Sequence, residues 1–360
     1  MAKKKIRMGV VGTGGIARGS HIPGIQRSPD AELVALCDIV PEKLKSAAET
    51  YSIEDAYCFK NYRDLIKCPD VDAITICTPN DSHVPIALEA VAHNKPFAVE
   101  KPISTNARSA KKLADAVAAA SLPSMICFSY RFRSSAMYAK DFVSSGKLGK
   151  LRHVYTRYTQ AWANPENNTP LVWRFNEKMS GSGALGDLGS HMLDLVRFII
   201  DEEYIDFTAM NGTFTRERSV INGKPGETGV VDVDDYSHFF ATTSGGIATS
   251  FEISRNCTGR GNYQRIEIYG DKGAIVYEAE HEDSLSVCLE PDQLNRKRFD
   301  RIPIPVKYKA DQMQTFFNMV KGRKSFPGAT IADGYMNQVY LDAVKRSAKS
   351  GKIVRIQAQS

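Results

Sequence analysis

The stretch Ile6-Arg-Met-Gly-Val-Val-Gly-Thr-Gly-Gly-Ile-Ala17 predicts the fold of the first part of this chain. Its apolar run at 6–11 is typical of a buried parallel strand, and the glycines that follow favour a tight turn into a helix from about Gly15. The spacing Gly12-x-Gly14-x-x-Ala17 is that of a dinucleotide-binding turn, in which small residues let the backbone and the pyrophosphate approach closely. The residues predicted to hold that pyrophosphate at the helix start are Gly12, Thr13, Gly14, Gly15, Ile16 and Ala17.

Strands and helices alternate from this turn to about residue 129. Apolar, strand-like runs lie at 32–38, 73–78, 95–100 and 124–129, and helical patterns lie at 41–51, 82–93 and 107–120. Such alternation is typical of a doubly wound parallel sheet with helices on both faces. We therefore expect residues 1–129 to form an α/β domain of the Rossmann type.

The pattern changes after about residue 130. A helix at about 135–146 and an alternating strand at 151–159 precede strand-like segments between 207 and 287, which Gly and Asp turns separate. This pattern indicates an α+β domain, residues 130–360, with a large and mostly antiparallel open sheet. Helices expected within 311–350 close the chain, and they could pack back on the first domain.

Composition argues against several classes of partner. The chain has 360 residues with a net charge of +6, and no basic stretch is interleaved with aromatic residues, so we expect no nucleic-acid partner. No apolar run reaches the roughly 18 residues of a membrane span, so we expect no membrane partner. The seven cysteines show no CxxC pair and no spacing suited to zinc, which predicts reduced thiols, no metal and a cytoplasmic location.

Asp38 ends the second predicted strand, about 20 residues after the glycine turn. A carboxylate in this position binds the ribose hydroxyls of NAD, and it would repel the 2′-phosphate of NADP. The following Ile39-Val40-Pro41 offers no Arg for such a phosphate, although Arg18 or Lys43 could still reach it. We therefore predict NAD rather than NADP.

Two further segments follow predicted strand ends, where sheets of this kind bind ligands. Thr78-Pro-Asn-Asp-Ser-His83 would turn Asn80 toward a cofactor, or it is an ordinary helix-capping turn with Asp81 or Ser82 as the cap. Glu100-Lys101-Pro102 follows the next strand, and the residue before a proline is kept out of helical geometry. Its lysine is then either a fixed group beside a cofactor or a lysine of a surface loop.

A second glycine-rich stretch, Gly181-Ser-Gly-Ala-Leu-Gly-Asp-Leu-Gly-Ser-His-Met-Leu-Asp194, predicts a turn that leads into another helix. Asp187, His191 and Asp194 are spaced by four and three residues, which places them on one face of an α-helix. An acid and a histidine on one face suit proton transfer, whereas a solvated helix with a hydrogen-bonded histidine is the simpler interpretation. A partner elsewhere in the chain decides between the two.

Together these segments resemble the Gfo/Idh/MocA oxidoreductase family, which includes inositol and glucose–fructose type dehydrogenases. The resemblance covers nearly the whole chain, and the Glu-Lys-Pro and Asp-x-x-x-His elements are more specific than the glycine turn. Ala17 departs from a strict glycine fingerprint, as it does in many members. The matching segments are Gly12–Ala17, Thr78–Asn80 with His83, Glu100–Pro102, Trp173-Arg174 and Gly183–Asp194.

The resemblance implies a Rossmann domain followed by a sheet domain whose open face often forms oligomer contacts, and hence a homo-oligomer, either dimer or tetramer. It implies Lys101, Asp187 and His191 as the catalytic set. It also implies that Trp173-Arg174 contacts the nicotinamide side of the cofactor. The cofactor contacts that it implies at the strand ends are Thr78, Asn80, His83, Glu100 and Lys101.

This catalytic set suits the oxidation of a secondary alcohol, in which hydride leaves for nicotinamide while the hydroxyl loses its proton. His191 would be the general base, and Lys101 would donate to the reacting oxygen. Asp187 would orient the imidazole or bind a neighbouring substrate hydroxyl. Asp194 is a candidate either for a substrate contact or for support behind these groups.

Aromatic and amide side chains indicate a polyhydroxylated substrate, that is, a sugar, a sugar derivative or an inositol. Tyr158, Trp162 and the Asn/Pro loop 164–170 suit such a ring, although they equally suit core and surface loop. Arg131 and Arg133 could bind a carboxylate or phosphate, or serve as surface or cofactor contacts. The predicted substrate contacts are Arg131, Tyr158, Trp162, Asp187 and His191.

Two other functions remain open. One is an NAD-dependent glycosidase that works by transient oxidation and elimination, with no net release of NADH. The other is a non-enzymatic, ligand-sensing regulator on the same fold. The joint presence of Lys101, Asp187 and His191 disfavours the regulator.

Overall fold

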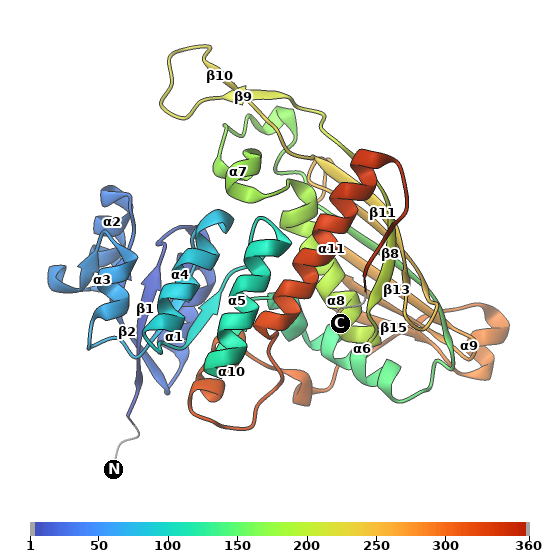
Figure 1. The fold of residues 1–360 in the computed structure, drawn as a ribbon. Helices are drawn as coiled ribbons and strands as arrows, with labels where there is room; N and C mark the ends of the chain where they lie inside the picture. Colours follow the sequence, from blue (N-terminus) through green and yellow to red (C-terminus); the bar gives the residue numbers. More distant parts are fainter. Residues whose placement is uncertain (1–3, 358–360) are drawn as a thin grey trace. The chain divides into compact units, whose positions relative to one another are not determined.

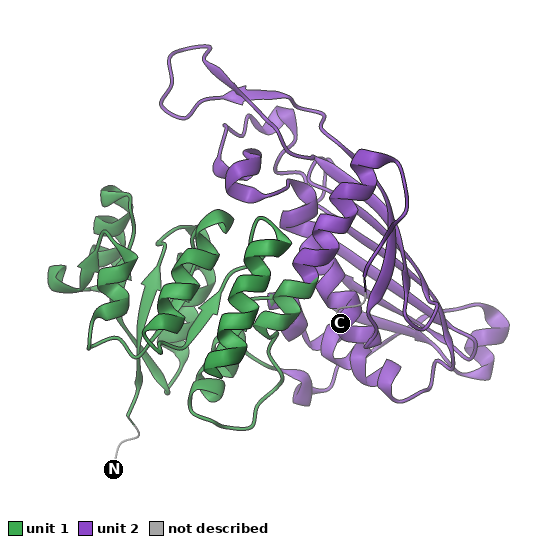
Figure 2. Ribbon diagram, in the orientation of Figure 1, with its two compact units in different colours: residues 1–128, 310–336 green, residues 129–309, 337–360 purple. Residues whose placement is uncertain are grey.

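The computed structural model describes residues 4–357, which form two compact units (Figure 2). Unit 1 holds the described residues up to Phe128 together with Ala310–Met336, and unit 2 holds Ser129–Lys309 together with the described residues from Asn337. The chain thus returns to unit 1 after completing most of unit 2, and it leaves unit 1 again within helix α11 (Ile331–Ser350). Unit 1 is therefore built from two separate stretches of the chain.

Unit 1 contains a six-stranded sheet in which all neighbouring strands are parallel. Its order is β3-β2-β1-β4-β5-β6, so the sheet grows in opposite directions from β1 and β4. The predicted doubly wound parallel sheet is confirmed, and its switch point, where such folds bind ligands, lies between the ends of β1 and β4. The strands are β1 (Ile6–Val11), β2 (Ala31–Cys37), β3 (Cys58–Phe59), β4 (Ala73–Ile76), β5 (Phe97–Val99) and β6 (Ser124–Ile126).

Helices cover the sheet of unit 1 (Figure 1), and the strand side chains between them, such as Ile74 and Val99, are fully buried. Strand β3 has two residues and helix α3 has six, and both are too short to carry the periodicity that predicts an element. The helices are α1 (Ile22–Arg27), α2 (Pro41–Tyr51), α3 (Tyr62–Lys67), α4 (Asn80–Ala92), α5 (Ala107–Ala120) and α10 (Gln312–Val320).

Helix α4 begins earlier than the sequence predicts, which corrects the proposed caps. Its N-cap position is Pro79, which offers no side-chain hydrogen bond, and Asp81 already lies in the first turn. The Ser82 hydroxyl donates instead to the Pro79 carbonyl at 2.7 Å, and its oxygen lies 2.8 Å from the Thr78 hydroxyl. The turn is therefore closed by contacts back to the strand end.

Unit 2 contains a nine-stranded sheet of order β16-β15-β14-β13-β7-β12-β11-β8-β17. All neighbouring pairs are antiparallel except β7 and β12, so the predicted, mostly antiparallel sheet is confirmed. The strands are β7 (Leu151–Thr159), β8 (Tyr204–Gly212), β11 (Tyr236–Thr243), β12 (Ala248–Ser254), β13 (Tyr263–Gly270), β14 (Ala274–Ala279), β15 (Asp283–Cys288), β16 (Asp300–Ile302) and β17 (Val354–Arg355). A separate hairpin joins β9 (Glu217–Ser219) to β10 (Thr228–Val230).

The two faces of this sheet differ. One face packs against helices α6 (Ser134–Ser144) and α8 (Ser190–Ile200), and α11 runs alongside them in Figure 1. The opposite face carries exposed side chains, since Tyr155 is 47%, Phe240 65% and Met210 58% exposed. Strand register places Tyr155, Ser250 and Phe240 in one row across neighbouring strands, so these residues share that face. Arg157 and Glu252, two residues further along the same strands, are paired on this face, so the open face mixes aromatic and charged side chains.

No helix within residues 4–357 is long and apolar enough to cross a membrane. All seven cysteines are free thiols, as the sequence predicted. The expectation that they belong to the core holds for the buried ones, Cys37, Cys77, Cys127 and Cys288.

Candidate active site

The glycine turn after β1 has the shape that its spacing predicted. Gly12 has φ +89°, and a Cβ on it would lie 2.7 Å from the Cys77 carbonyl oxygen, so only glycine lets β1 and β4 end side by side. A Cβ on Gly14 or Gly15 would meet no atom within 4 Å, which leaves the backbone open to a ligand. The helix that follows opens with a π-helical turn, η1 (Ala17–His21), in which Ala17 is fully buried.

Asp38 is anchored to the same turn. Its Oδ2 accepts the Thr13 N–H and the Thr13 hydroxyl, both at 2.8 Å, and its Oδ1 accepts the Val40 N–H at 2.9 Å. These bonds fix a carboxylate beside the open glycine backbone at the carboxyl end of β2. Thr13, which was expected to touch the cofactor, is thus also the link between the turn and Asp38.

The neighbours of Asp38 suit NAD. Ile39 is 84% exposed directly after the carboxylate, and an apolar side chain there offers a face for an adenine ring but nothing for a 2′-phosphate. The Arg18 guanidinium donates to the carbonyls of Thr13 and Lys43, both at 3.0 Å, so it is already engaged by the protein. The open glycine backbone, the fixed carboxylate and the engaged Arg18 together fit NAD.

His83 connects the two loops at the ends of β4 and β5. Its ring is fully buried, with Nδ1 2.9 Å from the Pro102 carbonyl oxygen and Nε2 2.9 Å from the Thr78 carbonyl oxygen. Burial lowers the pKa of His83, against the opposing effect of those two carbonyls. A neutral ring carries one N–H and donates to one of them. The imidazole therefore braces the Thr78–Asn80 and Glu100–Pro102 segments, and we leave His83 out of the proposed cofactor contacts.

Glu100 also points into unit 1. Its Oε1 lies 2.8 Å from Nε2 of His21, and its Oε2 accepts the Lys101 N–H at 3.2 Å. Burial raises the pKa of Glu100, but the hydrogen bond and charge of His21 outweigh that effect and lower it overall. We therefore also leave Glu100 out of the proposed cofactor contacts. Sequence reasoning missed His21, because a histidine in a helix carries no signal of its own.

The second glycine stretch is anchored by Asp234. Its carboxylate accepts the Gly183 N–H at 2.8 Å and the Leu185 N–H at 2.7 Å. A Cβ on Gly183 would lie 1.8 Å from the Asp234 carbonyl oxygen, so glycine is required where the two backbones meet. Sequence reasoning missed Asp234, which lies far away in the chain.

The helix after this stretch corrects the predicted geometry. Residues Leu185–Gly189 form a π-helical turn, η6, and α8 starts only at Ser190. Asp187 therefore lies in the π turn and His191 in the first turn of α8, rather than both in one α-helix. Turns with i to i+5 hydrogen bonds are rare and often occur at functional sites. The side chain of Asp187 is 20% exposed, and His191 is 7% exposed.

Aromatic, hydroxyl and amide groups surround His191. The Tyr130 ring centroid is 4.3 Å from that of the imidazole, and the Tyr130 and Tyr158 hydroxyls are 2.7 Å apart. The Tyr158 hydroxyl donates to Asn262 Oδ1 at 2.6 Å, and Gln160 Nε2 donates to the same oxygen at 2.7 Å. Burial raises the pKa of Tyr158 well above its ordinary value. We call Tyr130, Tyr158, Gln160 and Asn262 the hydroxyl–amide cluster.

Sequence reasoning found Tyr158 and His191 but missed Tyr130, Gln160 and Asn262. Tyr130 lies in a short 3-10 turn, η3 (Ser129–Phe132), Gln160 follows β7, and Asn262 precedes β13. Only sheet pairing brings these segments together, because Tyr158 of β7 pairs directly with Gln264 of β13.

Arg174 lies beside the π turn that carries Asp187. Arg174 Nε is 3.7 Å from Asp187 Oδ1, and its guanidinium lies over the Trp173 ring at 4.4 Å. The Arg174 side chain is 41% exposed, so water screens this ion pair. Arg174, which was predicted together with Trp173 to contact the cofactor, therefore lies beside Asp187 within unit 2.

Trp162 belongs to a small apolar cluster. Its ring centroid is 5.4 Å from that of Phe175, and the buried Arg255 guanidinium lies 5.2 Å from it. The fully buried members of the cluster include Ala163 and Phe175. Trp162 thus has a packing role, and we leave it out of the proposed substrate contacts.

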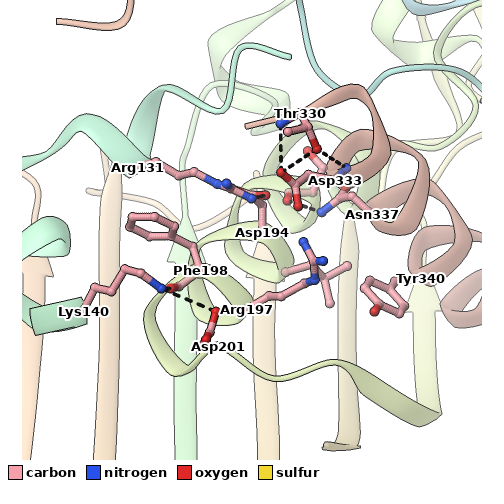
Figure 3. A network of polar contacts seen from close by, with 12 residues as sticks. Arg131, Lys140, Asp194, Arg197, Phe198, Asp201, Thr330, Asp333, Asn337 and Tyr340 are labelled. Carbon is pink, nitrogen blue, oxygen red and sulfur yellow. Dashed lines mark hydrogen bonds and ion pairs between the residues drawn. The ribbon is translucent and has the colours of Figure 1, made fainter. Parts of the chain in front are cut away.

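Arg131 binds a carboxylate inside the protein. Its Nε and one terminal nitrogen donate to the two oxygens of Asp194 at 2.7 and 2.5 Å, and both side chains are buried (Figure 3). We therefore remove Arg131 from the predicted substrate contacts and give Asp194 a supporting role. The pair ties η3 to α8, and this holds the neighbouring Tyr130 against His191. Lys140 makes a separate and largely exposed ion pair with Asp201 at the end of α8, at 3.6 Å.

Comparison with family models covers both units. Residues 6–127 match the GFO_IDH_MocA model, described as an oxidoreductase family with an NAD-binding Rossmann fold. Residues 136–276 match the model of the GFO/IDH/MocA C-terminal domain. The predicted cofactor, NAD, is thus confirmed for the first domain.

Two named relatives and a solved structure are similar over most of their lengths. Levoglucosan dehydrogenase of Pseudarthrobacter phenanthrenivorans is 31% identical over 341 residues, which cover 86% of this chain and 85% of the relative. Myo-inositol 2-dehydrogenase of Thermotoga maritima is 27% identical over 355 residues, 98% of this chain and 99% of the relative. A structure of levoglucosan dehydrogenase with NADH and L-sorbose superposes with a TM-score of 0.88 at 29% identity, covering 98% of this chain and 99% of that one.

These matches confirm the resemblance that the motifs suggested. The chain is an NAD-binding oxidoreductase and belongs to the Gfo/Idh/MocA family.

Proposed function

We propose that this protein is an NAD-dependent dehydrogenase that oxidises a secondary hydroxyl of a sugar, a sugar derivative or an inositol. The observation that carries the proposal is the buried His191 imidazole, set against the Tyr130 and Tyr158 rings of the hydroxyl–amide cluster. The names of the relatives support the substrate class, since they act on levoglucosan and myo-inositol. The substrate-binding residues we now propose are Asp187, His191, Tyr158, Tyr130, Gln160 and Asn262.

His191 is the proposed general base. Histidine is the side chain whose ordinary pKa is best suited to accept a proton near neutral pH. The Tyr130 ring, 4.3 Å away, restrains the imidazole from one side. NAD, bound at the glycine turn after β1, supplies the hydride acceptor. Proton removal by His191 then leaves the hydroxyl carbon able to release its hydride.

Lys101 and Asp187 have supporting roles in the proposal. Lys101 donates to the reacting oxygen and stabilises the negative charge that develops on it. Asp187 binds a neighbouring substrate hydroxyl or orients the imidazole, and Arg174 Nε lies 3.7 Å from its carboxylate. Both assignments rest on the family resemblance, with the Arg174 contact as additional support for Asp187.

The hydroxyl–amide cluster favours a ring with many hydroxyls. Tyrosine hydroxyls and side-chain amides both donate and accept, so they match the hydroxyls around a sugar or inositol ring. The partly exposed Tyr130 ring, whose centroid is 5.8 Å from that of the buried Tyr158 ring, offers apolar surface for its C–H faces. Anhydrosugars, aldoses and inositols are therefore the substrates to test first.

NADH formation across a panel of these compounds and aryl glycosides tests the proposal. We expect NADH to accumulate with at least one cyclic polyol, and His191→Asn and Lys101→Met to lower kcat by about 10²–10⁴-fold with the fold intact. Normal turnover by folded variants would contradict the assignment. Release of an aryl alcohol without net NADH would support the glycosidase, and sugar binding without turnover would support the regulator.

We further propose that the protein is a cytoplasmic homo-oligomer. Its free thiols suit a reducing compartment. The open face of the unit 2 sheet, with Tyr155, Met210 and Phe240 exposed, is the proposed interface. Light scattering should give a mass at least twice that of the chain, and Phe240→Asp should reduce it. A wild-type monomer would contradict the interface.

A further inference from the structure

His21 is a fully buried histidine outside the groups that the proposed reaction uses. It ends the π turn η1, and both of its ring nitrogens have partners. Nδ1 lies 2.5 Å from the Thr75 hydroxyl of β4, and Nε2 lies 2.8 Å from Glu100 Oε1 at the end of β5. The imidazole therefore joins the first helix to two neighbouring strand ends.

The hydrogen-bond chain continues to Lys101. The second oxygen of Glu100 accepts the Lys101 backbone N–H at 3.2 Å. On the other side of Lys101, the Pro102 carbonyl oxygen lies 2.9 Å from His83. Both neighbours of Lys101 are thus held by a buried histidine of unit 1. The link through Glu100 differs from the link through Pro102, because Glu100 also carries the negative charge of a carboxylate.

The 2.8 Å contact between the imidazole and the Glu100 carboxylate favours the charged form of His21. Burial works against the His21 imidazolium, but Cys77 and the Glu100 carboxylate outweigh it and raise the pKa of His21 to about 10. The other titratable groups that act on the pair are Cys127, Lys101 and His83. Of these groups, only Lys101 takes part in the proposed reaction.

A metal site is the competing explanation. Ligand atoms of His21, Glu100 and Cys127 lie within 4.8 Å of one another, and all three residues have little exposed surface. Both imidazole nitrogens, however, are already in hydrogen bonds with oxygen atoms. A metal would have to break the bond to Glu100, so the hydrogen-bonded pair explains the geometry better.

We propose that His21 and Glu100 are a positioning pair for Lys101. The Glu100 carboxylate binds the lysine backbone N–H and places a negative charge near its ammonium group. The His21 imidazolium holds that carboxylate in place and balances its charge. This inference deepens the proposed function and rests on it for the role of Lys101. The pair itself touches no reacting atom in the proposal.

Removing each partner should shift the ionisation of Lys101 in opposite directions. Glu100→Gln keeps the shape but removes a negative charge, which makes the ammonium easier to deprotonate. His21→Gln removes a positive charge and leaves the carboxylate uncompensated, which makes the ammonium harder to deprotonate. If the pair had only a structural role, the two variants would not shift the ionisation of Lys101 in opposite directions. Each shift should be about one pH unit, given a charge several ångströms away in a partly screened interior.

The pH dependence of amine labelling at Lys101, followed by peptide mass spectrometry without NAD, measures these shifts directly. We expect the labelling midpoint to fall in Glu100→Gln, to rise in His21→Gln and to return near wild type in the double variant, which lacks both charges. Asp30→Asn is the matched control, since it removes a carboxylate paired with Lys321 and Arg323 at the opposite, amino-terminal end of the strands. Its midpoint should not move.

Kinetics give a second readout. Glu100→Gln should lower kcat about tenfold or more, with the KM for the sugar and the Kd for NAD changed less than about twofold. Equal midpoints in all variants, shifts in one direction, or stoichiometric zinc in the purified protein would overturn the inference. Opposite labelling shifts in a protein that oxidises no sugar would uphold the pair and reject the proposed function instead.

Discussion

The two glycine-rich turns, Gly12–His21 in unit 1 and Gly181–His191 in unit 2, are built alike and are used differently. Each has a glycine whose Cβ would strike a neighbouring backbone, at Cys77 or at Asp234. Each leads into a π-helical turn and a buried histidine. The turn therefore supplies the backbone geometry in both places, but it does not decide the chemistry.

The partners of each histidine make the difference. His21 lies between Thr75 and Glu100, and every contact is satisfied inside the unit. His191 lies against Tyr130, near the Tyr158 hydroxyl and its amide partners. The first environment suits a fixed charge, and the second suits a proton acceptor for a polar ligand.

The largest expected effect is on kcat, which should fall much more when His191 is replaced than when His21 is replaced. His191→Asn should lower kcat by about 10²–10⁴-fold while the melting temperature changes little, because the residue is needed for proton transfer. His21→Gln should lower kcat less and the melting temperature more. Steady-state kinetics and thermal unfolding of both variants check this. Equal kinetic losses would remove the distinction between the two environments.

The buried pair behind His191 should affect stability next. Asp194→Leu leaves the Arg131 guanidinium buried without its carboxylate, which should cost about 3–5 kcal/mol of unfolding free energy. The double variant Arg131→Met/Asp194→Leu should recover much of that loss, since no charge is then left unpaired. Urea unfolding of the three proteins measures the coupling. A double variant as unstable as Asp194→Leu would contradict the interpretation.

The pH dependence of stability should show the contribution of the charged His21 imidazole. Its pKa is raised from 6.5 to about 10 in the folded protein, so its contribution is fully present below pH 6.5 and is lost as the pH rises through about 10. Melting temperatures of the wild type should therefore approach those of His21→Gln between those pH values. The difference at neutral pH corresponds to about 1–3 kcal/mol, as for a buried polar group left unpaired. If the difference in melting temperature between wild type and His21→Gln instead grew with rising pH, the ionised pair would be rejected.

The smallest structural effect is expected at Gly14. A Cβ there meets nothing within 4 Å, so Gly14→Ala should change the unfolding free energy by no more than about 0.5 kcal/mol. The substitution should nevertheless weaken the binding of NAD, because the methyl group would occupy the space that the pyrophosphate approaches. Titration of NADH fluorescence measures the Kd. An unchanged affinity for NADH would show that Gly14 does not contribute to the binding of the pyrophosphate.

Sequence reasoning was most accurate where an element is long and periodic. The predicted bounds of β1, α2, α5 and β7 agree with the structure, because apolar periodicity and Pro or Gly boundaries define them. It missed β3, the β9–β10 hairpin and β16, which are short and stabilised by pairing with neighbours. It also assumed regular helix at Asp187, since a π turn has no sequence signature that spacing could show.

The sequence by itself determined the family, the cofactor and the candidate catalytic residues, because close approach to a dinucleotide demands small residues at fixed spacing, and proton transfer demands particular side chains. Only the tertiary structure decided the tasks of the remaining polar groups. Arg131 and Glu100 looked like ligand contacts in the sequence, yet Asp194 and His21 engage them inside the units. A buried charge must be paired, and its partner comes from any segment that the fold brings within hydrogen-bonding distance.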